Sequence, residues 1–169
     1  MVHVSASDSE VGKLGDFFID KFEVTNRIFK EFVTNGGYRK REFWKHEFLK
    51  EGTKLNWEEA MAEFVDSTGR PGPSTWVGGD YPPGKEGYPV SGVSWYEADA
   101  FAEYAHKNLP SILHWRAATG GGSDPVLNYS LSTVLIAQAP GYKAGHQLLK
   151  SSLFKKEKEK VVDFALVRQ

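Results

Sequence analysis

The chain has 169 residues, enough for one domain with a sizeable core, and its 40% hydrophobic and 25% charged content is that of a globular protein. Its 21 basic and 22 acidic side chains give a net charge of -1, which excludes the basic surface of a general nucleic-acid binder. No run approaches the length of a membrane-spanning helix, and Met1 to Gly15 lacks the apolar core of a secretory signal. We therefore expect no nucleic-acid or membrane partner. The expected location is cytoplasmic, or extracytoplasmic if the chain is a fragment of a larger membrane-anchored protein.

The chain contains no cysteine, which removes a large class of chemistry. It has no disulfide, no thiolate ligand for a metal and no cysteine nucleophile. The five histidines are scattered and none is paired at the spacing of a zinc-binding helix, so no metal site is predicted. No serine stands in the pattern of an activated nucleophile, so no catalytic residue is predicted.

One strand and one helix are predicted near the start of the chain. Phe17–Asp20 is a short apolar run typical of a strand. Thr25 or Asn26 can cap a helix whose apolar residues recur at helical spacing, and the pair Gly36 and Gly37 ends it.

Two later helices begin with a capping box, in which a polar residue is followed three positions on by glutamate. The first pairs Asn56 with Glu59, and the second pairs Ser94 with Glu97. A shorter helical turn is expected from Ser111. Since the capping role explains the Ser94 pair fully, we do not interpret it as a catalytic pair.

Between these helices, the segment from Gly69 to Gly92 holds seven glycines and five prolines, a density that predicts a long coil held by its aromatic residues. Rigid aromatic side chains are the usual contacts of a binding surface. The candidate ligand-binding residues are Trp76, Tyr81, Tyr88, Trp95 and Trp115. The alternative is that they fill the core, above all on the predicted helical faces, and Trp95 is accordingly predicted to be buried.

The chain changes character near Gly120, where a run of three glycines begins. Residues 1–120 hold 14 basic and 18 acidic side chains, whereas residues 121–169 hold 7 and 4. We predict a domain over residues 16–120 and a divergent tail of unknown role over 121–169. The tail is not expected to complete the core, and it docks at most one strand, near residues 131–139.

Three segments, in order, resemble the formylglycine-generating enzyme (sulfatase-modifying factor) family. They are Phe18–Asn26 (FIDKFEVTN), Tyr88–Ala98 (YPVSGVSWYEA) and the Leu109-Pro110 pair with Trp115. Residues 43–46 and 68–73 are similar to a bacterial subgroup often attached to serine/threonine kinases. The resemblance covers the N-terminal part of the family only. It implies an α+β, C-type-lectin-like fold that is rich in coil, has few short strands and is incomplete at its C-terminal end.

The departures from the family bear on its chemistry. Three glutamates of the family are replaced by Ile112, His114 and Arg116. The resemblance implies copper held by a cysteine pair, and calcium ligands, in the second half of the domain. None of these is found after Gly122, so no cofactor is predicted. Thiolates are the soft ligands that suit Cu(I), and no other side chain replaces them.

Three functions stay open from the sequence. The leading hypothesis is a non-catalytic, sensory module that binds a protein or a small molecule, attached to a kinase domain in its parent protein. The alternative is an accessory part of a formylglycine-generating or non-heme-iron oxidase-type enzyme whose metal site lies outside this chain. The third is a diversified lectin-like recognition domain, which presents loops from a stable scaffold.

Overall fold

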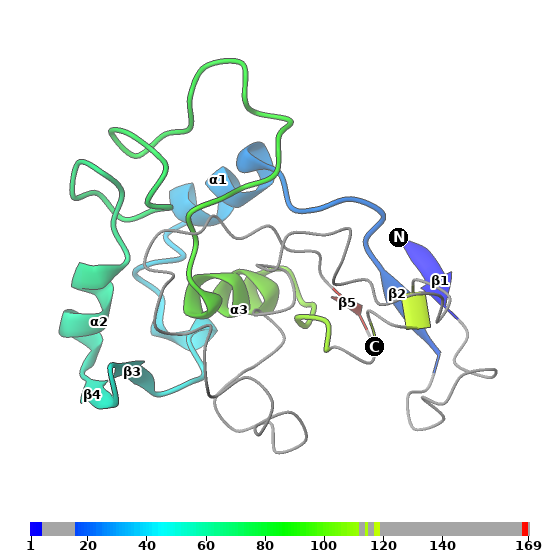
Figure 1. Cartoon of the computed structure of the whole chain (residues 1–169), viewed down its shortest axis with the longest axis horizontal. Helices are drawn as coiled ribbons and strands as arrows, with labels where there is room; N and C mark the ends of the chain where they lie inside the picture. The colour runs from blue at the N-terminus through cyan, green and yellow to red at the C-terminus, as the bar shows by residue number, and fades with distance from the viewer. Residues whose placement is uncertain (5–15, 112–113, 115–116, 119–166, 169) are drawn as a thin grey trace.

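The computed structural model describes residues 1–4, 16–111, 114, 117–118 and 167–168. In this part of the chain, three helices lie beside two small antiparallel sheets (Figure 1). The helices are α1 (Asn26–Thr34), α2 (Trp57–Glu63) and α3 (Trp95–Tyr104), with a 3-10 turn, η1 (Arg41–Phe43). The strands are β1 (Val2–Val4), β2 (Phe17–Ile19), β3 (Phe48–Lys50), β4 (Thr53–Leu55) and β5 (Val167–Arg168). None of the described helices is long and apolar enough to cross a membrane.

The first sheet joins the two ends of the chain. Its order is β1-β2-β5, with Ile19 of β2 opposite Val2 on one side and Val167 on the other. Along β2, the side chains of Phe17 and Ile19 are buried and that of Phe18 is exposed, which is the two-residue period of a half-buried strand. The strand predicted at Phe17–Asp20 is thus confirmed. Residues 131–139 lie outside the described residues, and β5 is a strand of the tail that the sequence pattern did not indicate.

The predicted helix starts are confirmed at the level of single hydrogen bonds. Thr25 caps α1 by accepting from the backbone N–H of Ile28. Full capping boxes begin α2 at Asn56 and α3 at Ser94. Mixed helices and short strands, as the sequence predicts, therefore make up the described fold.

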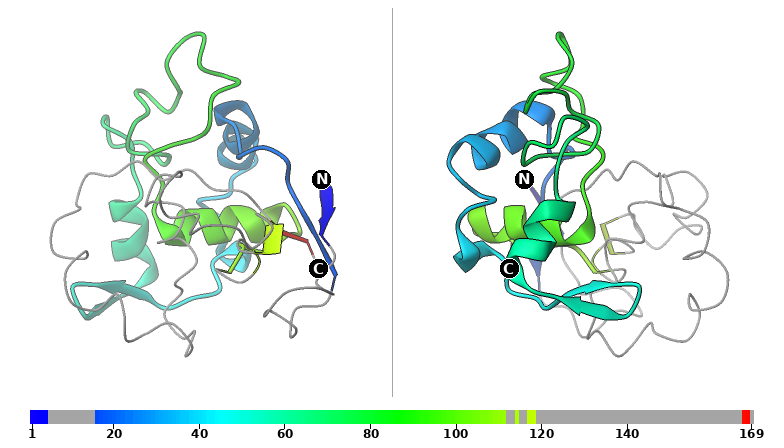
Figure 2. Two further views of the ribbon diagram at one scale, coloured as in Figure 1. Left: turned by 45° about the vertical axis from the view of Figure 1, so that its right-hand side comes forward. Right: turned by 90° about the vertical axis from the view of Figure 1, so that its left-hand side faces the viewer.

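Aromatic side chains fill the main core, which lies between α1, α3 and the segment around η1. Figures 1 and 2 show α3 at the centre, with α2 and the β3–β4 hairpin on the side opposite the β1–β2–β5 sheet. Phe29 of α1 stacks on Phe101 of α3, with ring centroids 5.2 Å apart. A smaller cluster, formed by Phe17 and Ile19, lies beneath the first sheet.

One ion pair ties the end of α3 to the segment after β2. The ammonium of Lys107 lies 2.8 and 2.7 Å from the two carboxylate oxygens of Asp20, and both side chains are mostly buried. We expect the Lys107–Asp20 coupling to be about 1 kcal/mol, at the upper end for such pairs. A double-mutant cycle with Lys107→Met and Asp20→Asn in urea unfolding measures it. A coupling indistinguishable from zero would contradict the prediction.

Candidate functional site

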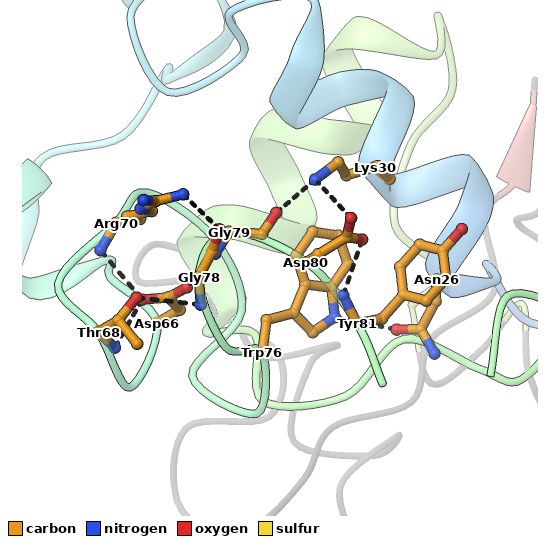
Figure 3. Close-up of polar contacts among 10 residues, drawn as sticks. All are labelled: Asn26, Lys30, Asp66, Thr68, Arg70, Trp76, Gly78, Gly79, Asp80 and Tyr81. Carbon is orange, nitrogen blue, oxygen red and sulfur yellow. Dashed lines mark hydrogen bonds and ion pairs between the residues drawn. The ribbon is translucent and has the colours of Figure 1, made fainter. Parts of the chain in front are cut away.

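The segment between α2 and α3, residues 64–94, contains no helix or strand and is called the coil below. It rises as the tall loops of Figure 1. The prediction of a long coil over Gly69–Gly92 is confirmed. Figure 3 shows the polar contacts that hold it against α1.

Asp66 fixes the base of the coil. Its side chain is buried, and Oδ1 accepts hydrogen bonds from the backbone N–H of Thr68 at 2.7 Å and of Arg70 at 3.0 Å. Oδ2 accepts from the backbone N–H of Gly79 at 2.5 Å (Figure 3). Burial alone would raise the pKa of Asp66, but a hydrogen bond that the Thr68 hydroxyl donates to Oδ1 at 2.7 Å and these backbone hydrogen bonds outweigh it and hold the pKa well below its ordinary value. An ionised Asp66 therefore binds two stretches of the coil together.

Two further contacts close the same loop. The guanidinium of Arg70 donates to the carbonyl of Gly78 at 2.6 Å. The hydroxyl of Thr68 accepts from the backbone N–H of Gly78 at 3.0 Å. Since the backbone groups of Gly78 are bonded on both sides, this part of the coil is fixed although it has no regular structure.

Trp76 anchors the coil in the main core. It has no exposed surface, and its ring contacts that of Phe29 edge-on at 6.2 Å. Its Nε1 donates to Oδ1 of Asn26 at 3.1 Å, and Nδ2 of Asn26 donates to the carbonyl of Lys85 at 2.9 Å. The first residue of α1 thus holds two distant parts of the coil.

Lys30 of α1 covers the outer side of this anchor. Its ammonium lies 5.6 Å from the centre of the Trp76 ring, donates to the carbonyl of Gly79, and lies 3.4 Å from the carboxylate of Asp80. Tyr81 meets the Trp76 ring edge-on at 5.6 Å. The arrangement places a cation, a carboxylate and the Tyr81 ring around the fully buried Trp76 ring (Figure 3).

The structure brings two of the five predicted ligand-binding residues into contact, Trp76 and Tyr81. Tyr88 is 55% exposed, and the ammonium of Lys85 lies 3.8 Å above its ring. Trp95 lies elsewhere, on α3, and Trp115 is outside the described residues. A role for these residues as ligand contacts stays a prediction.

The burial predicted for Trp95 needs correction, because the side chain is only half-buried. It shares a helix face with the buried residues Ala98 and Ala102, but it occupies the first position of α3, at the rim of the core. There its ring packs against His46 at 4.8 Å and Tyr96 at 5.5 Å.

His114 stands where the resembled family has a glutamate, and it exchanges hydrogen bonds with Ser111. Its Nδ1 accepts from the backbone N–H of Ser111 at 3.2 Å, and Ser111 Oγ accepts from the backbone N–H of His114 at 3.3 Å. The ring is buried against Phe17, and burial lowers the pKa of His114. These contacts give His114 a structural role, because they tie it to Ser111 and to Phe17 of β2. Ile112 and Arg116 are outside the described residues.

In the part of the chain that the structure describes, no three histidine, aspartate or glutamate side chains gather in a group that could hold a metal ion. His46 instead lies 3.3 Å from the carboxylate of Asp99, and His3 lies 3.4 Å from that of Asp16. His146 is outside the described residues.

Three residues that fix the coil were not predicted from the sequence: Asn26, Lys30 and Asp66. The sequence indicates Asn26 only as a helix cap. A signal existed for Asp66, since aspartate followed by Ser, Thr and Gly is typical of a turn in which the carboxylate binds backbone N–H groups ahead of it. Lys30 gave no signal, because a lysine on the outer face of a helix is ordinary.

Comparison with known proteins shows which family these residues belong to. The model of the sulfatase-modifying factor enzyme 1-like domain family matches residues 5–160. The chain belongs to this family, as its three ordered motifs indicated. The match extends past Gly120, and the predicted division of the chain at that point stays a prediction.

Several curated relatives match over part of their length. A formylglycine-generating enzyme of Thermomonospora curvata is 32% identical over 66% of this chain and 40% of its own length. A hercynine oxygenase of Mycolicibacterium thermoresistibile is 31% identical over 60% of this chain and 22% of its own. A serine/threonine-protein kinase, pkn1 of Chlamydia pneumoniae, is 45% identical over 24% of this chain and 6% of its own. The chain thus spans less than half the length of these relatives. No solved structure matches.

Proposed function

We propose that this chain is a non-catalytic binding module of the sulfatase-modifying factor family, which presents the coil to a protein or small-molecule ligand. The observation that carries the proposal is the contrast within the coil. Asp66 and Trp76 are buried and fully bonded, whereas Lys85 and Tyr88 stack on each other at the exposed surface. A binding surface held on a rigid base loses little conformational entropy when a ligand binds.

The absence of cysteine supports a module without the family's oxidative chemistry. The resemblance implies a copper ion held by two thiolates, and the 169 residues supply none. A second candidate follows from the partial coverage of the relatives. This candidate is an accessory part of an enzyme whose metal site lies outside this chain, and the 40% coverage of the Thermomonospora enzyme supports it.

The proposal includes a sensory role beside a kinase domain and a C-type-lectin-like arrangement. The segment shared with the Chlamydia kinase, 45% identical over 40 residues, supports the first. The mixed helices, small sheets and long fixed coil are consistent with the second. Both follow from the family resemblance.

The catalytic part of the proposal is tested with a cysteine-containing sulfatase peptide. Incubated with this chain, copper and oxygen, the peptide is expected to keep its mass, because no thiolate of this chain holds the copper. Mass spectrometry of the peptide measures the outcome. Conversion of its thiol to an aldehyde would overturn the proposal. Conversion only after a separate chain that carries the copper-binding cysteine pair is added would favour the accessory-part candidate.

The binding part is tested by selecting peptides from a random library on the immobilised chain, with a Tyr88→Ala variant as counter-selection. Tyr88 is exposed, so its loss is expected to change the free energy of unfolding by less than about 0.5 kcal/mol. Peptides that bind the unsubstituted chain and lose affinity for the variant would support the coil as the binding surface. Peptides that bind both equally would place the binding surface elsewhere.

A further inference from the structure

Three consecutive cations, Arg39, Lys40 and Arg41, follow α1 and are called the basic turn. All three side chains are exposed. Among the described residues, no carboxylate forms an ion pair with any of them, whereas both lysines of the β3–β4 hairpin are paired with glutamates. The basic turn is therefore a local positive surface in a chain whose net charge is -1.

The backbone of the basic turn is held in one conformation. The N–H groups of Arg39 and Lys40 both donate to the carbonyl of Gly36, at 2.9 and 3.1 Å. The preceding residue, Tyr38, is buried and donates its hydroxyl to the carboxylate of Glu97 at 2.6 Å. The turn is thus fastened to α1 on one side and to α3 on the other.

A close approach of backbone and ring adds to this rigidity. Gly37 lies directly against the buried ring of Phe32, and a Cβ atom at this position would stand 2.1 Å from a ring carbon. Only glycine fits there, so the start of the turn is set by the core.

Two of the three cations are also oriented by aromatic rings. The ammonium of Lys40 lies 5.9 Å from the centre of the Phe43 ring, and the guanidinium of Arg41 lies 5.9 Å from that of Trp57. Both rings pack against the main core. Cations placed in this way lose less side-chain entropy on binding than free ones.

We propose that the basic turn binds a short acidic segment of a protein partner. The partner segment is acidic because it must complement the positive charge of the turn, and it is short because the turn has only three cations. Exposed Glu42 follows the turn directly, so a long polyanion or a wide anionic membrane that extends beyond the three cations would meet a carboxylate as well. A few consecutive carboxylates meet the cations alone.

The test measures binding of a fluorescein-labelled peptide with four consecutive glutamates, and of its glutamine counterpart, by fluorescence anisotropy. The chain is expected to bind the glutamate peptide more tightly than the glutamine peptide. Its affinity for the glutamate peptide is expected to fall as the salt concentration rises. The triple variant Arg39→Ala, Lys40→Ala, Arg41→Ala is expected to lose about tenfold in affinity, since exposed pairs each contribute modestly. The matched control, Lys21→Ala, Arg27→Ala, Lys50→Ala, removes the same charge and is expected to stay within about twofold.

Equal losses in the two triple variants, or equal binding of the two peptides, would overturn the proposal. Tighter binding of duplex DNA or of anionic vesicles than of the glutamate peptide would overturn it as well. If the first triple variant does not fold, amide NMR shifts of the unsubstituted chain decide. Shifts confined to residues 36–45 support the proposal, and shifts elsewhere overturn it. A result that overturns the proposal for the basic turn leaves the proposal for the coil unaffected, because none of the substituted residues belongs to the coil.

Discussion

Replacing Trp76 with alanine is expected to lower the free energy of unfolding by about 3–5 kcal/mol. The side chain has no exposed surface, and its ring contacts Phe29 and Tyr81. The variant also leaves Oδ1 of the buried Asn26 without the hydrogen bond from Nε1, which adds to the cost of the cavity. For a domain of ordinary stability, about 5–15 kcal/mol, this is a large fraction of the total. Urea unfolding followed by circular dichroism measures it.

Trp95 offers a matched control, because the same substitution there removes a half-buried ring at the rim of the core. Trp95→Ala is expected to cost about 1–2 kcal/mol, in keeping with the smaller area that it buries. Losses of equal size in the two variants would contradict the assignment of Trp76 as the anchor of the coil. A loss below about 1 kcal/mol in Trp76→Ala would contradict it outright.

The helix starts could be predicted because each depends on residues three positions apart. A capping box such as Ser94 with Glu97 forms within one turn and needs no tertiary contact to be recognised. The β3–β4 hairpin could not be predicted in this way. Its two-residue turn places Glu51 and Gly52 at positive φ, 51° and 84°, and glutamate is not among the residues that signal such a turn.

The coil illustrates the same limit for the candidate site. Its existence followed from glycine and proline content, which act locally. The contacts that fix it join residues far apart in the chain: Trp76 and Asn26 are 50 positions apart, and Lys30 and Gly79 are 49 apart. No periodic pattern in the sequence marks such pairs. The contacts of Trp76 and Lys30 could therefore be identified only from the structure.

Glu97 takes part in both a local contact, which could be predicted, and a long-range contact, which could not. The capping box accounts for Oε2, which accepts from the backbone N–H of Ser94 at 2.6 Å. Oε1 accepts from the hydroxyl of Tyr38, 59 positions away, at 2.6 Å. Burial raises the pKa of Glu97 from its ordinary 4.5 to about 7, although both hydrogen bonds act against the rise. Burial and the neighbouring carboxylate also raise the pKa of Tyr38, which stays protonated.

Stability is therefore expected to fall as the pH rises from about 4.5 to 7. In this window the unfolded chain carries an ionised Glu97 while the folded chain keeps the proton, so the folded state binds more protons. The contribution of Glu97 to the free energy of unfolding amounts to roughly 3 kcal/mol. It is fully present below pH 4.5 and is lost as the pH rises through 7. Asp66 acts in the opposite sense at lower pH, because its pKa is held down in the folded state.

A Glu97→Gln variant isolates this contribution, because an amide can accept from Ser94 and donate to Tyr38 without ionising. The difference in free energy of unfolding, variant minus unsubstituted chain, is expected to grow by roughly 3 kcal/mol between pH 4.5 and 7.5, and to level off above it. Taking the difference cancels the titration of Asp99, whose pKa burial raises, and of His114, whose pKa burial lowers. Urea unfolding at a series of pH values measures both proteins. A difference that stays constant across this range would show that the pKa of Glu97 is the same in the folded and unfolded states. It would refute the claim that burial of Glu97 makes the stability depend on pH.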